Sequence, residues 1–113
     1  LWSGLAGSNN DSFKYVGDCD PVLIDEMTDA EKWDETVHEL AAIGIEGDKL
    51  QTLMRAVITV MQLGNLTFAE NPSNSEETII DSTDELDKLA DLLGVETNDI
   101  EGALTTRDVK VGR

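Results

Sequence analysis

The sequence has little of several residue types, and each scarcity excludes a class of structure. Its single cysteine, Cys19, has no partner for an internal disulfide and cannot form a Cys-rich metal site. Aromatic residues make up only 4% of the chain, so any core must rest on Leu, Ile, Val, Ala and Met. No apolar run is long enough to span a bilayer. What remains is 113 residues with 40% apolar content, which is enough for one small core.

Basic residues are also scarce. The chain has 24 acidic and 8 basic residues and a formal net charge of −16. Such a surface repels nucleic acid and anionic membranes, so we expect neither as a partner. Three of the bases, Arg107, Lys110 and Arg113, lie in the extended tail predicted for residues 107–113, which therefore has the opposite sign. The acidity fits either a solvated surface or a chain that normally sits inside a larger protein.

The apolar spacing predicts a mainly α-helical chain with short β segments. Residues 1–27 are expected to be mostly loop, and residues 28–63 to form two helices. Thr28 and Glu31 match a capping box at the start of the first helix, which has one apolar face. The second helix should run from about Asp48 to Leu63, and its many apolar positions predict burial on several sides.

The second half of the chain repeats this pattern. Residues 64–81 should form short strands around the polar loop AENPSNSEE, and residues 82–106 two further helices. Ser82 and Glu85 match a second capping box. Gly44, Gly64 and Gly94 each follow a helix and are followed closely by an apolar residue, which predicts left-handed glycine terminators at all three ends.

No pattern of catalytic or metal-binding residues is present, and we predict none in this chain. The best calcium window, residues 18–23, has Val22 and Leu23 where an EF-hand loop needs an oxygen ligand and Gly. The only histidine, His38, lies opposite the apolar stripe of its helix without a second histidine or a nucleophile nearby, so we interpret it as exposed or partly packed.

Two functional alternatives come from the residues alone. One is a stand-alone acidic helical interaction module. The other is an acyl-carrier-like domain, in which Ser82 after Asp81 would carry phosphopantetheine, although Thr83 stands where that pattern has Leu. Ser82 also has a sufficient structural role as the predicted N-cap of its helix.

Four segments in order resemble one stretch of the myosin motor domain. TDAEKWDETVHELAAIGI is similar to the family's Asp-Ala-Glu-x-Phe-x-Glu-Thr helix, with Trp33 in place of Phe. LMRAVITVMQLGNLTF is similar to its His-Leu-Gly-Asn-Ile-x-Phe signature, with Gln62 in place of His. LADLLGVETNDIEGALTTRDVKVG is similar to its Ala-Leu-Thr-x-Arg segment, and residues 1–7 to the run that follows switch I.

The resemblance implies that residues 1–113 are part of a myosin motor domain, a P-loop NTPase-related fold, and not a complete domain. It implies the upper 50-kDa subdomain, between switch I and the actin-proximal loop. The family's phosphate loop and both switch motifs are absent here, so we expect no cofactor in this segment, MgATP in the intact motor and no ATPase activity from this chain alone.

The implied partners are the remaining motor subdomains in cis and, through the intact motor, the actin filament of the cytoplasmic actin cytoskeleton. In the family, the loop after Ala-Leu-Thr-x-Arg reaches towards actin. By this resemblance Arg107, Lys110 and Arg113 are actin-proximal residues. The segment itself is then a helical part of the wall of the actin-binding cleft.

Overall fold

The computed structural model describes residues 1–17 and 23–112. It contains four α-helices and one two-stranded sheet among these residues. The elements are η1 (Ser3–Leu5), η2 (Asn10–Ser12), α1 (Asp29–Ala42), α2 (Asp48–Leu63), β1 (Phe68–Asn71), β2 (Asn74–Ile80), α3 (Thr83–Leu93) and α4 (Thr97–Thr105). The four helices lie where the apolar spacing predicted them, and residues 107–112 are extended without forming a strand.

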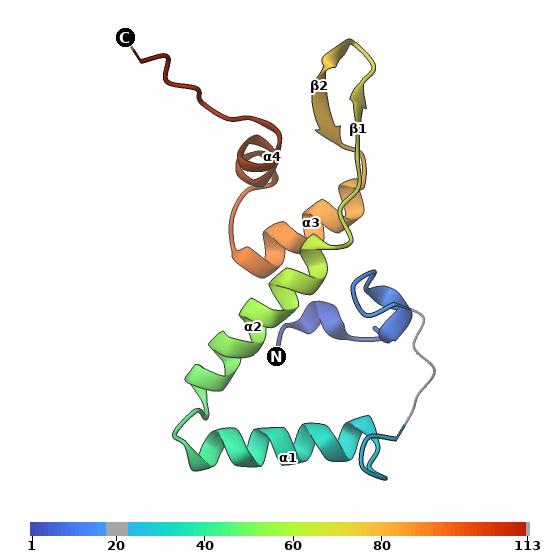
Figure 1. Ribbon diagram of the computed structural model, residues 1–113, viewed down its shortest axis with the longest axis vertical. Coiled ribbons are helices and arrows are strands. Elements are labelled where there is room, and N and C mark those ends of the chain that lie inside the picture. Colours follow the sequence, from blue (N-terminus) through green and yellow to red (C-terminus); the bar gives the residue numbers. More distant parts are fainter. Residues whose placement is uncertain (18–22, 113) are drawn as a thin grey trace.

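The core is small and is centred on α3. Its buried apolar side chains are Leu66, Ile80, Leu86, Leu89, Ala90 and Ile100. The closely packed pairs of elements are β1 with β2, α2 with α3, α3 with α4, and α4 with β2. In Figure 1, α1 lies beyond the far end of α2, away from this core. Consistent with that position, no residue of α1 is buried.

The chain is more open than a compact domain of its length. Its radius of gyration is 18.2 Å, against about 13 Å for a compact domain of this size. The expectation that α2 is buried on several sides is wrong, because only Ile58 and Gln62 are buried in this helix. Leu53, Val57 and Val60 follow each other at helical spacing on its outer face and are 38%, 47% and 57% exposed. The described chain supplies packing for one face of α2 only.

The polar segment after Leu66 is a β-hairpin, which corrects the predicted loop over residues 69–77. β1 and β2 pair antiparallel, with Phe68 opposite Ile80. The Asn71 side-chain oxygen accepts a hydrogen bond from the Ser73 N–H at 3.0 Å and closes the turn. Backbone pairing and this Asx turn need no apolar side chains, so the polar composition did not reveal the strands.

Glycine ends two helices as predicted and a third differently. Gly44 and Gly94 have φ angles of +84° and +70°, and the N–H groups of Ile45 and Val95 bond back across them to the helix carbonyls at 2.8 and 3.1 Å. Both ends are left-handed terminators. Gly64 instead has φ −63° and ψ −19°, so the predicted left-handed conformation is wrong there.

Candidate functional site

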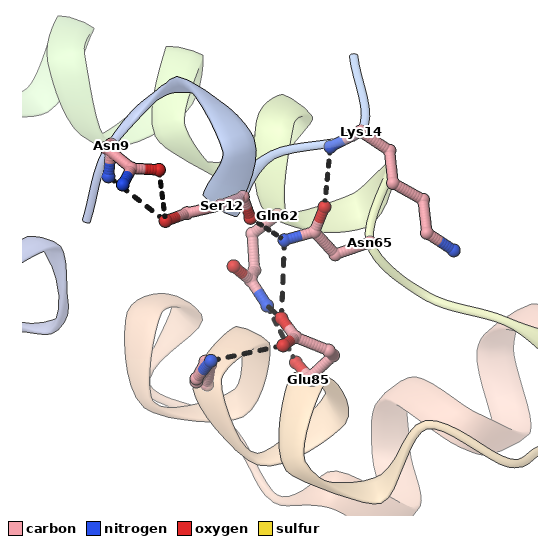
Figure 2. Close-up of polar contacts among 7 residues, drawn as sticks. Asn9, Ser12, Lys14, Gln62, Asn65 and Glu85 are labelled. Carbon is pink, nitrogen blue, oxygen red and sulfur yellow. Dashed lines mark hydrogen bonds and ion pairs between the residues drawn. The ribbon is translucent and has the colours of Figure 1, made fainter. Parts of the chain in front are cut away.

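Asn65, the residue after Gly64 at the end of α2, joins two distant parts of the chain. Its side chain is buried at 8% exposure. Its Nδ2 donates to the Ser12 carbonyl at 2.7 Å, and its Oδ1 accepts from the Lys14 N–H at 2.9 Å. Figure 2 shows this amide between the N-terminal segment, defined here as residues 1–17, and α3. One side chain thus bonds to the backbone of the N-terminal segment on both sides of Phe13.

Gln62, one turn earlier on α2, holds α3. It is 2% exposed, and its Nε2 donates to Glu85 Oε2 at 2.7 Å and to the Glu85 carbonyl at 3.0 Å. The same Oε2 accepts from Asn65 Nδ2 at 3.3 Å. Gln62, Asn65 and Glu85 therefore form one connected cluster, which we call the polar junction (Figure 2).

The Glu85 carboxylate is the charged member of the polar junction. Burial raises its pKa, but hydrogen bonds from Gln62, Lys88 and Asn65 and the charge of Lys88 outweigh burial and leave the pKa below its ordinary value. Lys88 Nζ lies 3.1 Å from Oε1, so the two carboxylate oxygens face different partners. Glu85 is accordingly held in its ionised, acceptor-only form at neutral pH.

The capping box predicted for Ser82 and Glu85 does not form. Ser82 makes no side-chain cap, and its Oγ accepts a hydrogen bond from the Thr67 N–H at 2.9 Å. Glu85 points to the side-chain amides of Gln62 and Asn65 instead of back to its own helix start, because those buried donors need an acceptor. Ser82 is only partly exposed and its hydroxyl is engaged, which does not favour the acyl-carrier alternative.

Further contacts fix the N-terminal segment on the helices. Trp2 Nε1 donates to Asp91 Oδ2 of α3 at 2.7 Å, and Phe13 is buried at 7% exposure. The Tyr15 ring covers Gly64, where an added Cβ would lie 2.7 Å from ring atoms. A hollow of about 290 Å³ remains under the segment, with Trp2, Gln62 and Lys88 among its lining residues. The segment spans α2 and α3.

Of the candidate site residues named from the sequence, Arg107, Lys110 and His38 are described by the structure, and none of them belongs to the polar junction. Arg107 and Lys110 are exposed in the extended tail after α4, while Arg113 and residues 18–22 of the calcium window at 18–23 lie outside the described residues. His38 is exposed on α1, as interpreted from its position. The actin-proximal assignment of the basic residues stays a prediction.

The polar junction was not predicted from the sequence, although one signal was present. Gln62 is a polar residue near the end of an apolar helix, and Asn65 follows directly after the glycine at its end. Within residues 1–17 and 23–112, no group of three or more His, Cys, Asp or Glu side chains could hold a metal ion. The polar junction serves for attachment, because its amides and carboxylate hold the N-terminal segment, α2 and α3 together.

In the same described part of the chain, none of the helices is both long and apolar enough to cross a membrane.

Known proteins resemble the chain along almost its whole length. It is 32% identical over 108 residues to unconventional myosin-Ic of Danio rerio, covering 94% of this chain and 10% of that protein. It is 32% identical over 83 residues to Myosin-14 of Mus musculus, covering 74% of this chain and 4% of that protein. Myosin-1 of Coprinopsis cinerea is 26% identical over 110 residues, covering 97% of this chain and 8% of that protein.

These relatives are much longer than this chain, which spans a tenth of their length or less. The family model described as myosin head (motor domain) matches residues 3–113. That match includes residues 3–17 of the N-terminal segment, the polar junction, the hairpin and the basic tail. The order of the motifs, the relatives and the family model agree, and the chain belongs to the myosin head (motor domain) family.

Proposed function

We propose that this chain is a helical part of the wall of the actin-binding cleft in an ATP-driven, actin-based motor. Within that motor, the chain belongs to the upper 50-kDa subdomain. The motor itself acts in the cytoplasmic actin cytoskeleton. Membership of the myosin head family over residues 3–113 carries the proposal. Neither the acidic interaction module nor the acyl carrier is favoured by that membership.

The exposed face of α2 supports a role inside a larger head. Leu53, Val57 and Val60 form an apolar stripe along this helix, and Trp33 of α1 is 40% exposed. Contiguous apolar surface on a soluble protein marks a contact with another element. In the proposed motor, other subdomains of the same polypeptide cover this stripe, and the segment moves with them as one body.

The nucleotide site belongs to other parts of the proposed motor. Phosphoryl transfer needs a phosphate cradle, a magnesium ligand and a positioned water, and the sequence of this chain contains no motif for them. The intact motor binds MgATP and is activated by actin, while these residues pass its movements to the cleft. The isolated chain has no ATPase activity under this proposal.

The basic tail is the proposed actin-facing end. Arg107, Lys110 and Arg113 give it a positive charge on an otherwise acidic chain. Charge complementarity of this kind mainly raises the rate of encounter with an acidic partner and depends on salt.

Charge reversal in the longer protein that contains this chain tests the proposal. The wild-type motor should show actin-activated ATPase activity, and the double variant R107E/K110E should need a severalfold higher actin concentration for half-activation. The single variants K110E and R55E form the matched comparison, because Arg55 is exposed and lies on the side of α2 opposite the apolar stripe. Absence of actin activation in the wild type would overturn the proposal, and equal effects of R55E and K110E would overturn the role of the tail.

A further inference from the structure

We infer that Glu85 is a positioning residue, which sets the attachment of the N-terminal segment to α2 and α3 through the side-chain amide of Asn65. Among the interactions of the described residues, Glu85 makes no hydrogen bond to residues 1–17. Its influence passes through Asn65, which bonds to both Glu85 and the segment. A mechanical role of these hydrogen bonds in a motor rests on the proposed function. The positioning of the Asn65 amide by Glu85 does not depend on it.

The argument starts from the asymmetry of an amide. One side of the Asn65 amide donates two hydrogen bonds and the other side accepts. An ionised carboxylate only accepts, so Glu85 requires the donating side to face it. With Nδ2 directed to Glu85 Oε2 and to the Ser12 carbonyl, Oδ1 is left facing the Lys14 N–H. Glu85 and the Ser12 carbonyl, which both only accept, thus together leave Oδ1 for the Lys14 N–H.

Glu85 is itself fixed from two further directions. Gln62 Nε2 from α2 donates to both the carboxylate and the carbonyl of Glu85, and Lys88 Nζ from α3 lies against the other carboxylate oxygen. Gln62 is 2% exposed, so bulk water cannot readily replace its partners. The carboxylate therefore has a defined position from which to orient the Asn65 amide.

The consequence is a mechanical connection between the N-terminal segment and α3. The segment is attached at Ser12 and Lys14 through Asn65, and at Trp2 through Asp91 of α3. By resemblance, its first residues follow switch I in the motor. A displacement of this segment is then passed to α3, and through the core to α4 and the basic tail.

Hydrogen exchange of the Lys14 backbone amide in the full 113-residue chain tests the inference. Lys14 is exposed, so its N–H owes its protection to Asn65 Oδ1. In Glu85→Gln, an NH₂ group replaces one acceptor oxygen, and we expect exchange at Lys14 to become about tenfold faster, as for loss of one ordinary hydrogen bond. Asp87→Asn makes the same charge change at an exposed site of α3 and should leave Lys14 unchanged.

A double-mutant cycle separates positioning from general loss of stability. In the Asn65→Ala background, Glu85→Gln should cause no further acceleration at Lys14, because the amide that transmits its effect is gone. The backbone N–H of Leu89, which lies in α3 and is fully buried in the core, is the internal reference for global unfolding. Additive effects of the two substitutions, or equal exchange in Glu85→Gln and Asp87→Asn, would overturn the inference.

If circular dichroism shows that Glu85→Gln has lost its helices, Glu85→Asp replaces it in both arms. Aspartate keeps the charge but is one methylene shorter, so it should release the Lys14 amide while keeping its pairing charge near Lys88. Unchanged protection in a folded Glu85→Asp chain would count against the inference. The assay contains neither ATP nor actin, so its failure leaves the proposed motor function untouched, and failure of actin activation leaves this result untouched.

Discussion

Gly64 lies under the ring of Tyr15, close enough that a Cβ at residue 64 would be 2.7 Å from the ring. The backbone of Gly64 is right-handed, with φ −63°, a conformation that any residue adopts. Glycine is therefore needed here for the close approach of a side chain and not for a left-handed turn. This contact brings the N-terminal segment directly onto the end of α2.

Gly64→Ala should loosen the N-terminal segment. The added methyl group displaces the Tyr15 ring, which is already 69% exposed and can move outwards. We expect faster amide exchange around residues 13–16 and a lower melting temperature in the full chain. Gly102→Ala is the matched control, because nothing lies within 4 Å of its Cβ position in α4. It should raise the free energy of unfolding by about 0.5–1 kcal/mol, and a stabilising Gly64→Ala would contradict the proposed contact.

Truncating a buried side chain of α3 should lower the free energy of unfolding strongly, whereas truncating an exposed side chain of α2 should change it little. Leu89 is fully buried at 0% exposure, whereas Val60 is 57% exposed. Leu89→Ala should lower the free energy of unfolding by about 2–5 kcal/mol, which a chain with so small a core does not readily tolerate. Val60→Ala should change it by less than about 0.5 kcal/mol in the isolated chain. Urea titration followed by circular dichroism compares the two, and similar costs would mean that α2 packs on both faces in solution.

Acid should weaken the polar junction. The pKa of Glu85 is lowered in the folded chain by the donors around it, despite the opposing effect of burial. An unfolded glutamate has a pKa of about 4.3, so the contribution of Glu85 is fully present above that pH. It is lost as the pH falls through the lower, folded-state pKa.

The measurement is the midpoint of urea unfolding at several pH values from neutral to about pH 3. The wild-type chain should lose stability over this acid range more steeply than Glu85→Gln, because the variant has no titratable group at residue 85. Asp87→Asn should follow the wild-type curve. Parallel curves for the wild type and Glu85→Gln would show that the lowered pKa of Glu85 does not contribute to stability.

Thr28 and Ser82 should give different results when each is replaced by alanine. Thr28 Oγ1 accepts from the Glu31 N–H at 3.3 Å, and Glu31 returns the bond to the Thr28 N–H at 2.8 Å. Thr28→Ala should cost about 1 kcal/mol and fray the first turn of α1. Ser82→Ala should cost a similar amount, about 1 kcal/mol, but release the Thr67 amide before β1. Amide exchange measured residue by residue distinguishes the two effects. Faster exchange in the first turn of α3 in Ser82→Ala would show that Ser82 caps this helix after all.

Local sequence patterns predicted the helices well. The span from Asp48 to Leu63, the capping box at Thr28 and the left-handed glycines at 44 and 94 all form as expected. Each depends on residues within a few positions of one another, such as periodic apolar side chains, a reciprocal cap or a residue free to adopt positive φ. Family membership was also predictable, because it rests on the order and separation of such motifs.

Predictions that depended on distant neighbours failed. Gly64, like the other two terminators, ends a helix and is followed closely by an apolar residue, but Tyr15 decides its role. Ser82 and Glu85 match a capping box, but the Ser82 hydroxyl accepts from the Thr67 N–H and the Glu85 carboxylate accepts from Gln62 Nε2 instead. The apolar positions of α2 suggested more burial than occurs, since the described chain offers nothing to cover Val57.

The sequence by itself determined the helices, the capping box at Thr28, the left-handed glycines at 44 and 94, the charge of the tail and the family. These features follow from short-range geometry and from motif order. Only the tertiary structure decided that Gln62, Asn65 and Glu85 meet, and that they hold the N-terminal segment on α2 and α3. The hydrogen bonds among these three residues and to the N-terminal segment join residues 20 to 53 positions apart along the chain. A buried donor or acceptor takes whichever partner the packing brings within reach, and that choice overrides the local preference written in the sequence.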